Sequence, residues 1–166
     1  VALLLLATAS PGQSGIDINK QKQTKMGKMK VEIWSDIMCP FCYIGKRHFE
    51  SALRGFADTN NIEIIWKSFQ LDPSIPESFD KSPGVYEYLA ERKGISYEQS
   101  VQMHGQVVQM AKNAGLEYNF DKAVVANSFN AHRVIQLAKT KGLGDAAEER
   151  LFLAYFTEGK NFGSPV

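Results

Sequence analysis

Two cysteines, Cys39 and Cys42, stand three positions apart and are the only cysteines in the 166-residue sequence. Thiol–disulfide exchange needs one thiolate that attacks a disulfide and a second thiol that resolves the mixed disulfide. A disulfide between residues this close constrains too short a loop to stabilise a fold much, so a structural bridge does not explain the pair. We therefore expect redox chemistry, with Cys39 attacking and Cys42 resolving.

The residues around the pair predict that it lies at the start of a helix. From Cys39 to Phe56, apolar residues recur at three- and four-residue steps, which is typical of an amphipathic helix. Unpaired N–H groups at a helix N-terminus favour a thiolate and lower its pKa. Pro40 suits the first turn because it has no N–H to pair. We expect Cys39 to be exposed there and Cys42, one turn further in, to be more buried.

Strands are predicted on both sides of this helix. Residues 30–34 and 62–69 are rich in β-branched and aromatic residues. A strand, a helix and a strand in direct succession predict a βαβ unit with parallel strands and a right-handed crossover. The cysteines then lie at the carboxyl end of the first strand, the edge where open α/β sheets carry their chemistry.

Two helices are predicted after a connector that contains several prolines. Ser82 followed by Pro83 resembles a cap and a first helical residue, and predicts a helix over 84–93. Ser96 and Gln99 form a capping box, which predicts a helix that runs to about residue 114.

Two further helices are predicted to begin at Asp121 and Asp145, because apolar residues follow each at helical spacing. The second of these runs to about Thr157. The sequence therefore predicts an α/β fold in which one βαβ unit precedes an all-helical segment.

Composition argues against nucleic acid as a partner. Lys and Arg total 19 against 18 Asp and Glu, which leaves a formal net charge of +1. Proteins that bind nucleic acid usually carry a basic face or stripe, and this balance provides none. We expect no nucleic-acid partner.

The apolar run Val1–Ala7 is too short to span a bilayer, so no membrane span is expected. The following Ala7-Thr8-Ala9 has the small-x-small form of a signal-peptidase site, which would make the run a truncated signal of an exported protein. The alternative is an internal start at Met26 or Met29, ahead of which residues 1–28 are a linker or read-through sequence. We favour the internal start and a cytoplasmic protein.

A zinc site is the main rival explanation for the cysteine spacing. Structural zinc takes four ligands, and only His48, His104 and His132 could complete the set. None of them has ligand spacing to the pair, so we expect no metal. His48 follows the cysteines on the same predicted helix and is expected to be a surface or half-buried residue.

Three stretches resemble the DsbA superfamily, specifically its FrnE-like branch. The first is VEIWSDIMCPFCYIG over residues 31–45, the second is FQLDP over 69–73, and the third is NSFNAHR over 127–133. The similarity extends over about residues 29–160. It implies a thioredoxin-like fold with an inserted all-helical domain. It also implies oxidase or isomerase activity on protein disulfides.

The resemblance also implies roles for individual residues and for segments. Cys39 and Cys42 carry the exchange, and the dipeptide Pro40-Phe41 between them tunes their redox chemistry. The exchange requires no cofactor. Asp36, three residues before the pair, is a further candidate at the site, and His132 and Arg133 match a segment that we place near it. After residues 1–28, which are a linker, a signal remnant or read-through sequence, the implied segments are the N-terminal βαβ part of the thioredoxin-like domain over 29–75, the helical insertion domain over 76–160 and the start of the return to the truncated thioredoxin-like domain over 161–166.

In this family a second half completes the thioredoxin module, beginning with a cis-proline loop. We expect that half to be missing from the chain, which ends before it at Val166. The implied partners are protein thiols and disulfides and a redox partner system, for which glutathione is one candidate.

Two other functions remain open. Kappa-class glutathione transferases and 2-hydroxychromene-2-carboxylate isomerases share the insertion, but they usually carry a serine in place of a redox pair. A chaperone-like binding module that holds clients on its helical segment is the non-enzymatic alternative.

Overall fold

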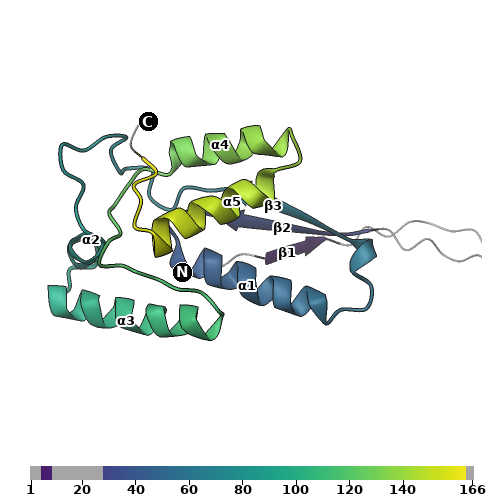
Figure 1. Ribbon diagram of the computed structural model, residues 1–166, viewed down its shortest axis with the longest axis horizontal. Helices are drawn as coiled ribbons and strands as arrows, with labels where there is room; N and C mark the ends of the chain where they lie inside the picture. Colours follow the sequence, from purple (N-terminus) through teal and green to yellow (C-terminus); the bar gives the residue numbers. More distant parts are fainter. Residues whose placement is uncertain (1–4, 9–27, 164–166) are drawn as a thin grey trace, which may run out of the picture.

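A computed structural model describes residues 5–8 and 28–163 of the chain. A small sheet lies beside five α-helices (Figure 1). The strands are β1 (Leu5–Thr8), β2 (Met29–Ser35) and β3 (Ile62–Ser68), and the helices are α1 (Pro40–Arg54), α2 (Val85–Lys93), α3 (Tyr97–Asn113), α4 (Phe129–Lys139) and α5 (Gly144–Phe152).

The predicted βαβ unit is confirmed. β2 and β3 are parallel, in register from Met29 opposite Ile62 to Ser35 opposite Ser68, and α1 connects them. Alternate residues of β2 are buried, as a strand with one covered face requires. Because Ser35 is the last residue of β2, the loop that follows it carries the chain directly to the cysteines at the carboxyl edge of the sheet.

β1 was not predicted. Leu5–Thr8 pairs antiparallel with β2, placing Leu5 opposite Ile33 and Thr8 opposite Lys30. An edge strand presents unpaired N–H and C=O groups that another extended segment can satisfy, and a segment of four residues is long enough to do so. Of the segment predicted over 1–28, residues 1–4 and 9–27 lie outside the described residues, and these include the candidate start Met26.

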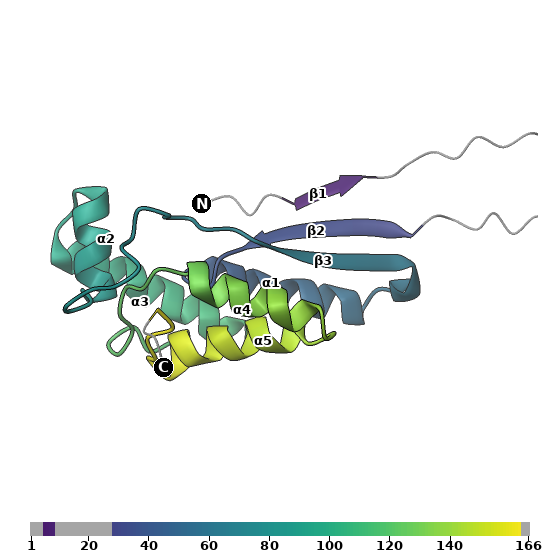
Figure 2. The same cartoon turned by 90° about the horizontal axis from the view of Figure 1, so that it is seen from above.

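The helices cover one face of the sheet. Figure 2 shows α1, α4 and α5 side by side beneath β2 and β3, whereas α2 and α3 lie beyond the carboxyl ends of the strands. This two-layer arrangement buries the apolar face of each element against the other layer. The cysteine pair, at the start of α1, therefore lies where the sheet, the helical layer and the α2–α3 pair meet.

The helix predicted over 84–93 is confirmed to within one residue as α2, but its predicted cap is wrong, and the start of α3 is confirmed. α2 begins at Val85 with Gly84 as its cap, not at Pro83. Pro83 is engaged elsewhere, because its carbonyl accepts a hydrogen bond from Val125 N. In α3 the Ser96 hydroxyl accepts from Gln99 N while the Gln99 side chain accepts from Ser96 N, which is the predicted capping box.

The helix predicted to begin at Asp121 is also wrong over its first turns. α4 begins only at Phe129, with Ser128 as its cap. Val124 pairs with Gly84 in an isolated antiparallel bridge, and the neighbouring residue donates to Pro83. This long-range pairing holds residues 121–128 out of a helix. The last helix ends close to its predicted end, because α5 continues in a π-helical turn to Thr157.

Aromatic rings connect α1 to the helical segment. The ring of Tyr43 on α1 stacks on Phe152 with centroids 4.7 Å apart, and Tyr118 stacks on Phe156 at 4.5 Å. All four side chains are buried. No helix among residues 28–163 is both long and apolar enough to cross a membrane.

Candidate functional site

Cys39 and Cys42 lie at the junction of β2 and α1. Cys39 is the cap residue of α1, with extended backbone angles, and Pro40 occupies the first helical position. Cys39 N donates to Asp36 O at 2.9 Å, and Cys42 N donates to Cys39 O at 3.0 Å. Two successive turns therefore fix the cysteines against the end of the strand. Both cysteines are free thiols.

The expectation that only Cys39 is exposed is wrong. Cys39 is 4% exposed and Cys42 is 7% exposed, so both thiols are buried. The helical segment covers the start of α1, where the Tyr118 hydroxyl donates to Pro40 O at 2.7 Å. Phe41, between the cysteines, is the residue of the motif that faces solvent, at 39% exposure.

Hydrogen bonding gives the two thiols different proton affinities. The Cys42 thiol donates to Cys39 Sγ, and this bond lowers the pKa of Cys39. The backbone N–H groups of Cys42 and Phe41 lower it further, against the effects of burial and of the nearby Asp36 charge. The same bond, together with burial and the charge on Cys39, raises the pKa of Cys42. Cys39 is therefore the thiol that ionises first, and Cys42 keeps its proton.

Asp36 and His132, two of the predicted site residues, are in contact. His132 Nε2 lies 3.3 Å from Asp36 Oδ1, and both side chains are buried. The other Asp36 oxygen accepts from Leu71 N at 2.7 Å. Asp36 thus ties the loop before Cys39 to the segment after β3 and to α4. The negative charge of Asp36 also acts on Cys39, because it raises the pKa of Cys39 against the groups that lower it.

The three stretches that carry the family resemblance converge at this point. Besides the Asp36 contacts, Gln70 Nε2 donates to Asn127 Oδ1 at 2.9 Å, which links the second stretch to the third. Asn127 Oδ1 also accepts from Phe129 N at 2.9 Å, at the start of α4. The stretches are far apart in sequence, but their hydrogen-bonded side chains Asp36, Gln70, Asn127 and His132 lie together behind the loop that carries Cys39. We call this cluster the polar support.

Arg133 lies apart from this support. Its side chain is exposed and donates to Asn130 Oδ1 at 3.0 Å. It faces a groove of about 530 Å³ between the end of β3 and α4, whose lining is mostly apolar. The residues that line the groove are Ser68, Phe69, Gln70, Phe129, His132, Arg133 and Gln136. His132 is therefore shared between the groove and the polar support of the loop that carries Cys39.

Buried polar residues beneath the pair were not predicted. Ser35, at the end of β2, is 1% exposed, and Glu148 on α5 is 3% exposed. Lys46 on α1 is equally buried and pairs with Glu50, with Asp145 at 3.0 Å and with Glu149 at 3.5 Å. A sequence signal existed for Glu148, because it shares the helical face of Phe152, four residues later.

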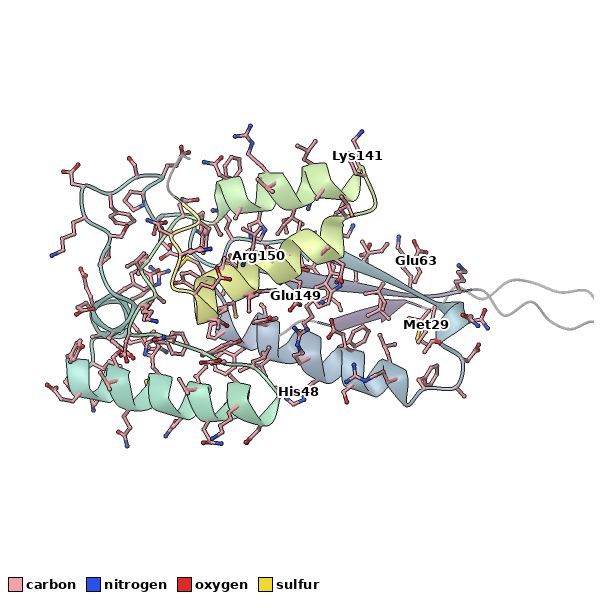
Figure 3. All side chains as sticks on the ribbon, viewed as in Figure 1. Met29, His48, Glu63, Lys141, Glu149 and Arg150 are labelled. Atoms are coloured by element: carbon pink, nitrogen blue, oxygen red, sulfur yellow. The ribbon has the colours of Figure 1, made fainter. Side chains whose placement is uncertain are left out.

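The remaining histidines lie elsewhere. Figure 3 shows His48 on the outer side of α1, as expected for a surface residue. The His104 ring sits edge-on between Tyr86 and Phe120, with centroid distances of 4.9 and 4.7 Å. Within residues 28–163, no three His, Cys, Asp or Glu side chains are grouped so that they could hold a metal ion.

Comparison with known proteins agrees with this architecture. The family model described as the DSBA-like thioredoxin domain matches residues 30–166. YwbO of Bacillus subtilis is 30% identical over 135 residues, which are 80% of this chain and 59% of YwbO. The crystal structure of a probable DsbA oxidoreductase from Streptomyces coelicolor superposes with a TM-score of 0.75 at 33% identity, covering 80% of this chain and 56% of that one. The chain thus spans less than two thirds of the length of either relative.

Proposed function

Because the chain belongs to the DSBA-like thioredoxin domain family, we propose that it is a thiol–disulfide oxidoreductase that works through the Cys39-Pro40-Phe41-Cys42 centre. The family and the thioredoxin-like fold with its helical insert rest on the match over residues 30–166 and on the Streptomyces structure. The FrnE-like branch, the roles of the two cysteines and the protein substrates are parts of the proposal.

The observation that carries the proposal is the placement of two free thiols at the start of α1, with Cys39 as the cap residue and Cys42 in the first turn. Cys42 lowers the pKa of Cys39 there. The thiolate is the species that attacks a disulfide, so the cysteine with the lowered pKa is the nucleophile. The neighbouring thiol of Cys42 keeps its proton and lies in the first turn of the same helix, so it is the group that resolves the mixed disulfide. Cys39 therefore attacks and Cys42 resolves.

The exchange needs no cofactor, because the two thiols themselves supply or accept the two electrons. Cys39 Sγ bonds to one client sulfur while the other client sulfur leaves. Cys42 then displaces the first client sulfur and closes the Cys39–Cys42 disulfide. A redox partner, for which glutathione is a candidate, returns the pair to its starting state.

Apolar side chains around the centre suit protein clients. Phe41 is exposed between the cysteines, and Phe69 and Phe129 are each 49% exposed at the groove beside His132. Clusters of exposed aromatic side chains bind the apolar segments that unfolded chains present. We propose that clients are cysteine-containing proteins that are not yet folded.

The test is catalysed exchange with a peptide that contains one disulfide, followed by the separation of its reduced and oxidised forms. We expect turnover by the parent protein, none by Cys39→Ser, and a trapped mixed disulfide between Cys39 and the peptide in Cys42→Ser. The control is His48→Ala, which alters the exposed side of the same helix. Full turnover by Cys39→Ser would refute the proposal.

The same variants separate the two alternatives. Glutathione conjugation that survives Cys42→Ser but not Cys39→Ser would favour a kappa-class transferase or a 2-hydroxychromene-2-carboxylate isomerase. A double serine variant that prevents aggregation as well as the parent, in a protein without exchange activity, would favour the chaperone-like module.

A further inference from the structure

Both thiols of the redox pair are closed off from solvent, although the proposed reaction requires one of them to meet a disulfide. Cys39 is 4% exposed and Cys42 is 7% exposed. Exchange begins when the attacking thiolate comes into contact with a sulfur atom of the client. A client does not reach Cys39 in this arrangement, so exchange requires a neighbouring part of the molecule to move away.

Residues 115–120, which we call the cover segment, lie against the first turn of α1. The chain leaves α3 and passes the start of α1, where the Tyr118 hydroxyl donates to Pro40 O at 2.7 Å (Figure 1). Tyr118 and both cysteines belong to one buried hydrophobic cluster. Burial raises the pKa of Tyr118, and the two cysteines raise it as well, which agrees with this position. The cover segment is therefore the neighbour whose movement would uncover the pair.

The cover segment is irregular and is attached at only a few points. None of its six residues belongs to a helix or a strand. It begins at Gly115, whose φ of 76° lies in the left-handed region that favours glycine. Asn119 N donates to Phe156 O at 2.6 Å, and the Thr157 hydroxyl donates to Glu117 O at 2.6 Å. Segments of this kind open locally at a lower free-energy cost than the helices and strands around them.

We propose that the cover segment is a gate over the redox pair and that the hydrogen bond from Tyr118 to Pro40 O keeps the gate closed. This inference rests on the redox function proposed above. When the bond breaks and the segment moves away from α1, Cys39 becomes accessible to a client disulfide. When the bond forms again, the pair is shielded. Tyr118 is thus a positioning residue that controls access to Cys39 and takes no part in the exchange itself.

The rate at which iodoacetamide labels Cys39 in the reduced protein measures how often the gate is open, because the reagent alkylates only a thiolate that it can reach. Tyr118→Phe removes the hydroxyl but keeps the ring that stacks on Phe156. The net contribution of one hydrogen bond corresponds to about a five-fold change in an equilibrium. Labelling of Cys39, identified by mass spectrometry, should therefore be about five-fold faster in Tyr118→Phe than in the parent.

Two further variants make the test specific. Tyr86→Phe is the matched control, because it also removes a tyrosine hydroxyl, one that donates to Asp121 Oδ1 at 2.9 Å beside the cover segment. It should label at the parent rate. Thr157→Val removes the hydroxyl that holds the cover segment at Glu117 O, so it should accelerate labelling as well. Thr157→Val decides the question alone if Tyr118→Phe does not fold.

Two conditions distinguish a gate from a general loosening of the fold. A local opening exposes little surface, so the labelling rates of the parent and of Tyr118→Phe should hardly change with urea below the unfolding transition. The ratio of the two rates should also be the same at mildly acidic and at mildly alkaline pH, because the substitution changes access to Cys39 and not its pKa.

Equal labelling rates in Tyr118→Phe and the parent, or the same acceleration in Tyr86→Phe, would overturn the gate. An unchanged rate in Thr157→Val would do so if Tyr118→Phe does not fold. A rate that rises steeply with urea would show that Cys39 is reached only by global unfolding, which also overturns the gate. Alkylation does not depend on exchange activity, so a parent protein without peptide turnover would contradict the redox function alone.

Discussion

At the scale of single residues, the opposite pKa shifts of Cys39 and Cys42 distinguish two cysteines that are otherwise alike. Both are buried and both lie in the first turn of α1. Cys39 becomes the thiolate and Cys42 keeps its proton, because the pKa of Cys39 is lowered and that of Cys42 is raised. The assignment of nucleophile and resolving thiol therefore follows from these opposite shifts and not from exposure.

Asp36→Asn should make Cys39 more acidic. The Asp36 carboxylate opposes ionisation of Cys39, so removing its charge should lower the pKa of Cys39 further. The measurement is the rate at which iodoacetamide labels Cys39 in the reduced protein at mildly acidic pH, with Asp80→Asn as an exposed control. Slower labelling in a folded Asp36→Asn protein would contradict this electrostatic account.

The sequence located part of the surroundings of the cysteine pair but not the rest. The spacing of Cys39 and Cys42 and the matching stretches were enough to select Asp36 and His132, which the structure brings into contact. Ser35, Tyr118 and Glu148 were not selected, because their importance depends on which helix packs over the start of α1. Burial of Cys39 was missed for the same reason.

At the scale of elements, local signals located some boundaries correctly and others not. The capping box of α3 is complete within four residues, so the sequence alone revealed it. The starts of α2 and α4 depend on the bond between Val125 N and Pro83 O, whose partners are distant in sequence. β1 likewise depends on an available edge of β2. Neither pairing can be derived from a local pattern.

Ser96→Ala should weaken the start of α3. The substitution removes the hydroxyl that accepts from Gln99 N, and the loss of a cap of this kind costs about 1 kcal/mol. Urea unfolding of the parent and of Ser96→Ala gives the difference, with Gln102→Ala on an exposed side of α3 as the control. Equal free energies of unfolding in the parent and in Ser96→Ala would show that the box does not stabilise the helix.

At the scale of the whole molecule, one aromatic cluster holds the redox helix against the rest of the fold. Tyr43 projects from α1 onto Phe152, and Tyr118 and Phe156 extend the stack. Tyr118 also bonds to the first residue of α1 through its hydroxyl. The geometry of the cysteines therefore depends on the helical segment as well as on the strand that precedes them.

Phe156→Ala should destabilise the whole protein. Phe156 is fully buried, and removing a buried phenylalanine ring costs about 3–5 kcal/mol. Chemical unfolding followed by circular dichroism measures the loss, and Val134→Ala, at 54% exposure, is the control. A loss in Phe156→Ala no larger than that in Val134→Ala would contradict the role of the cluster.

The most direct test of the central claim is a pH titration of the Cys39 thiolate, followed by its ultraviolet absorbance in Cys42→Ser and Cys42→Ala. Cys39→Ser is the blank, and circular dichroism confirms the fold at each pH. We predict a midpoint well below about 8.5, the value of a free thiol, in Cys42→Ser, because a serine hydroxyl can still donate to Cys39. The midpoint in Cys42→Ala should be higher. A midpoint at or above that of a free thiol in folded Cys42→Ser would contradict Cys39 as the activated nucleophile.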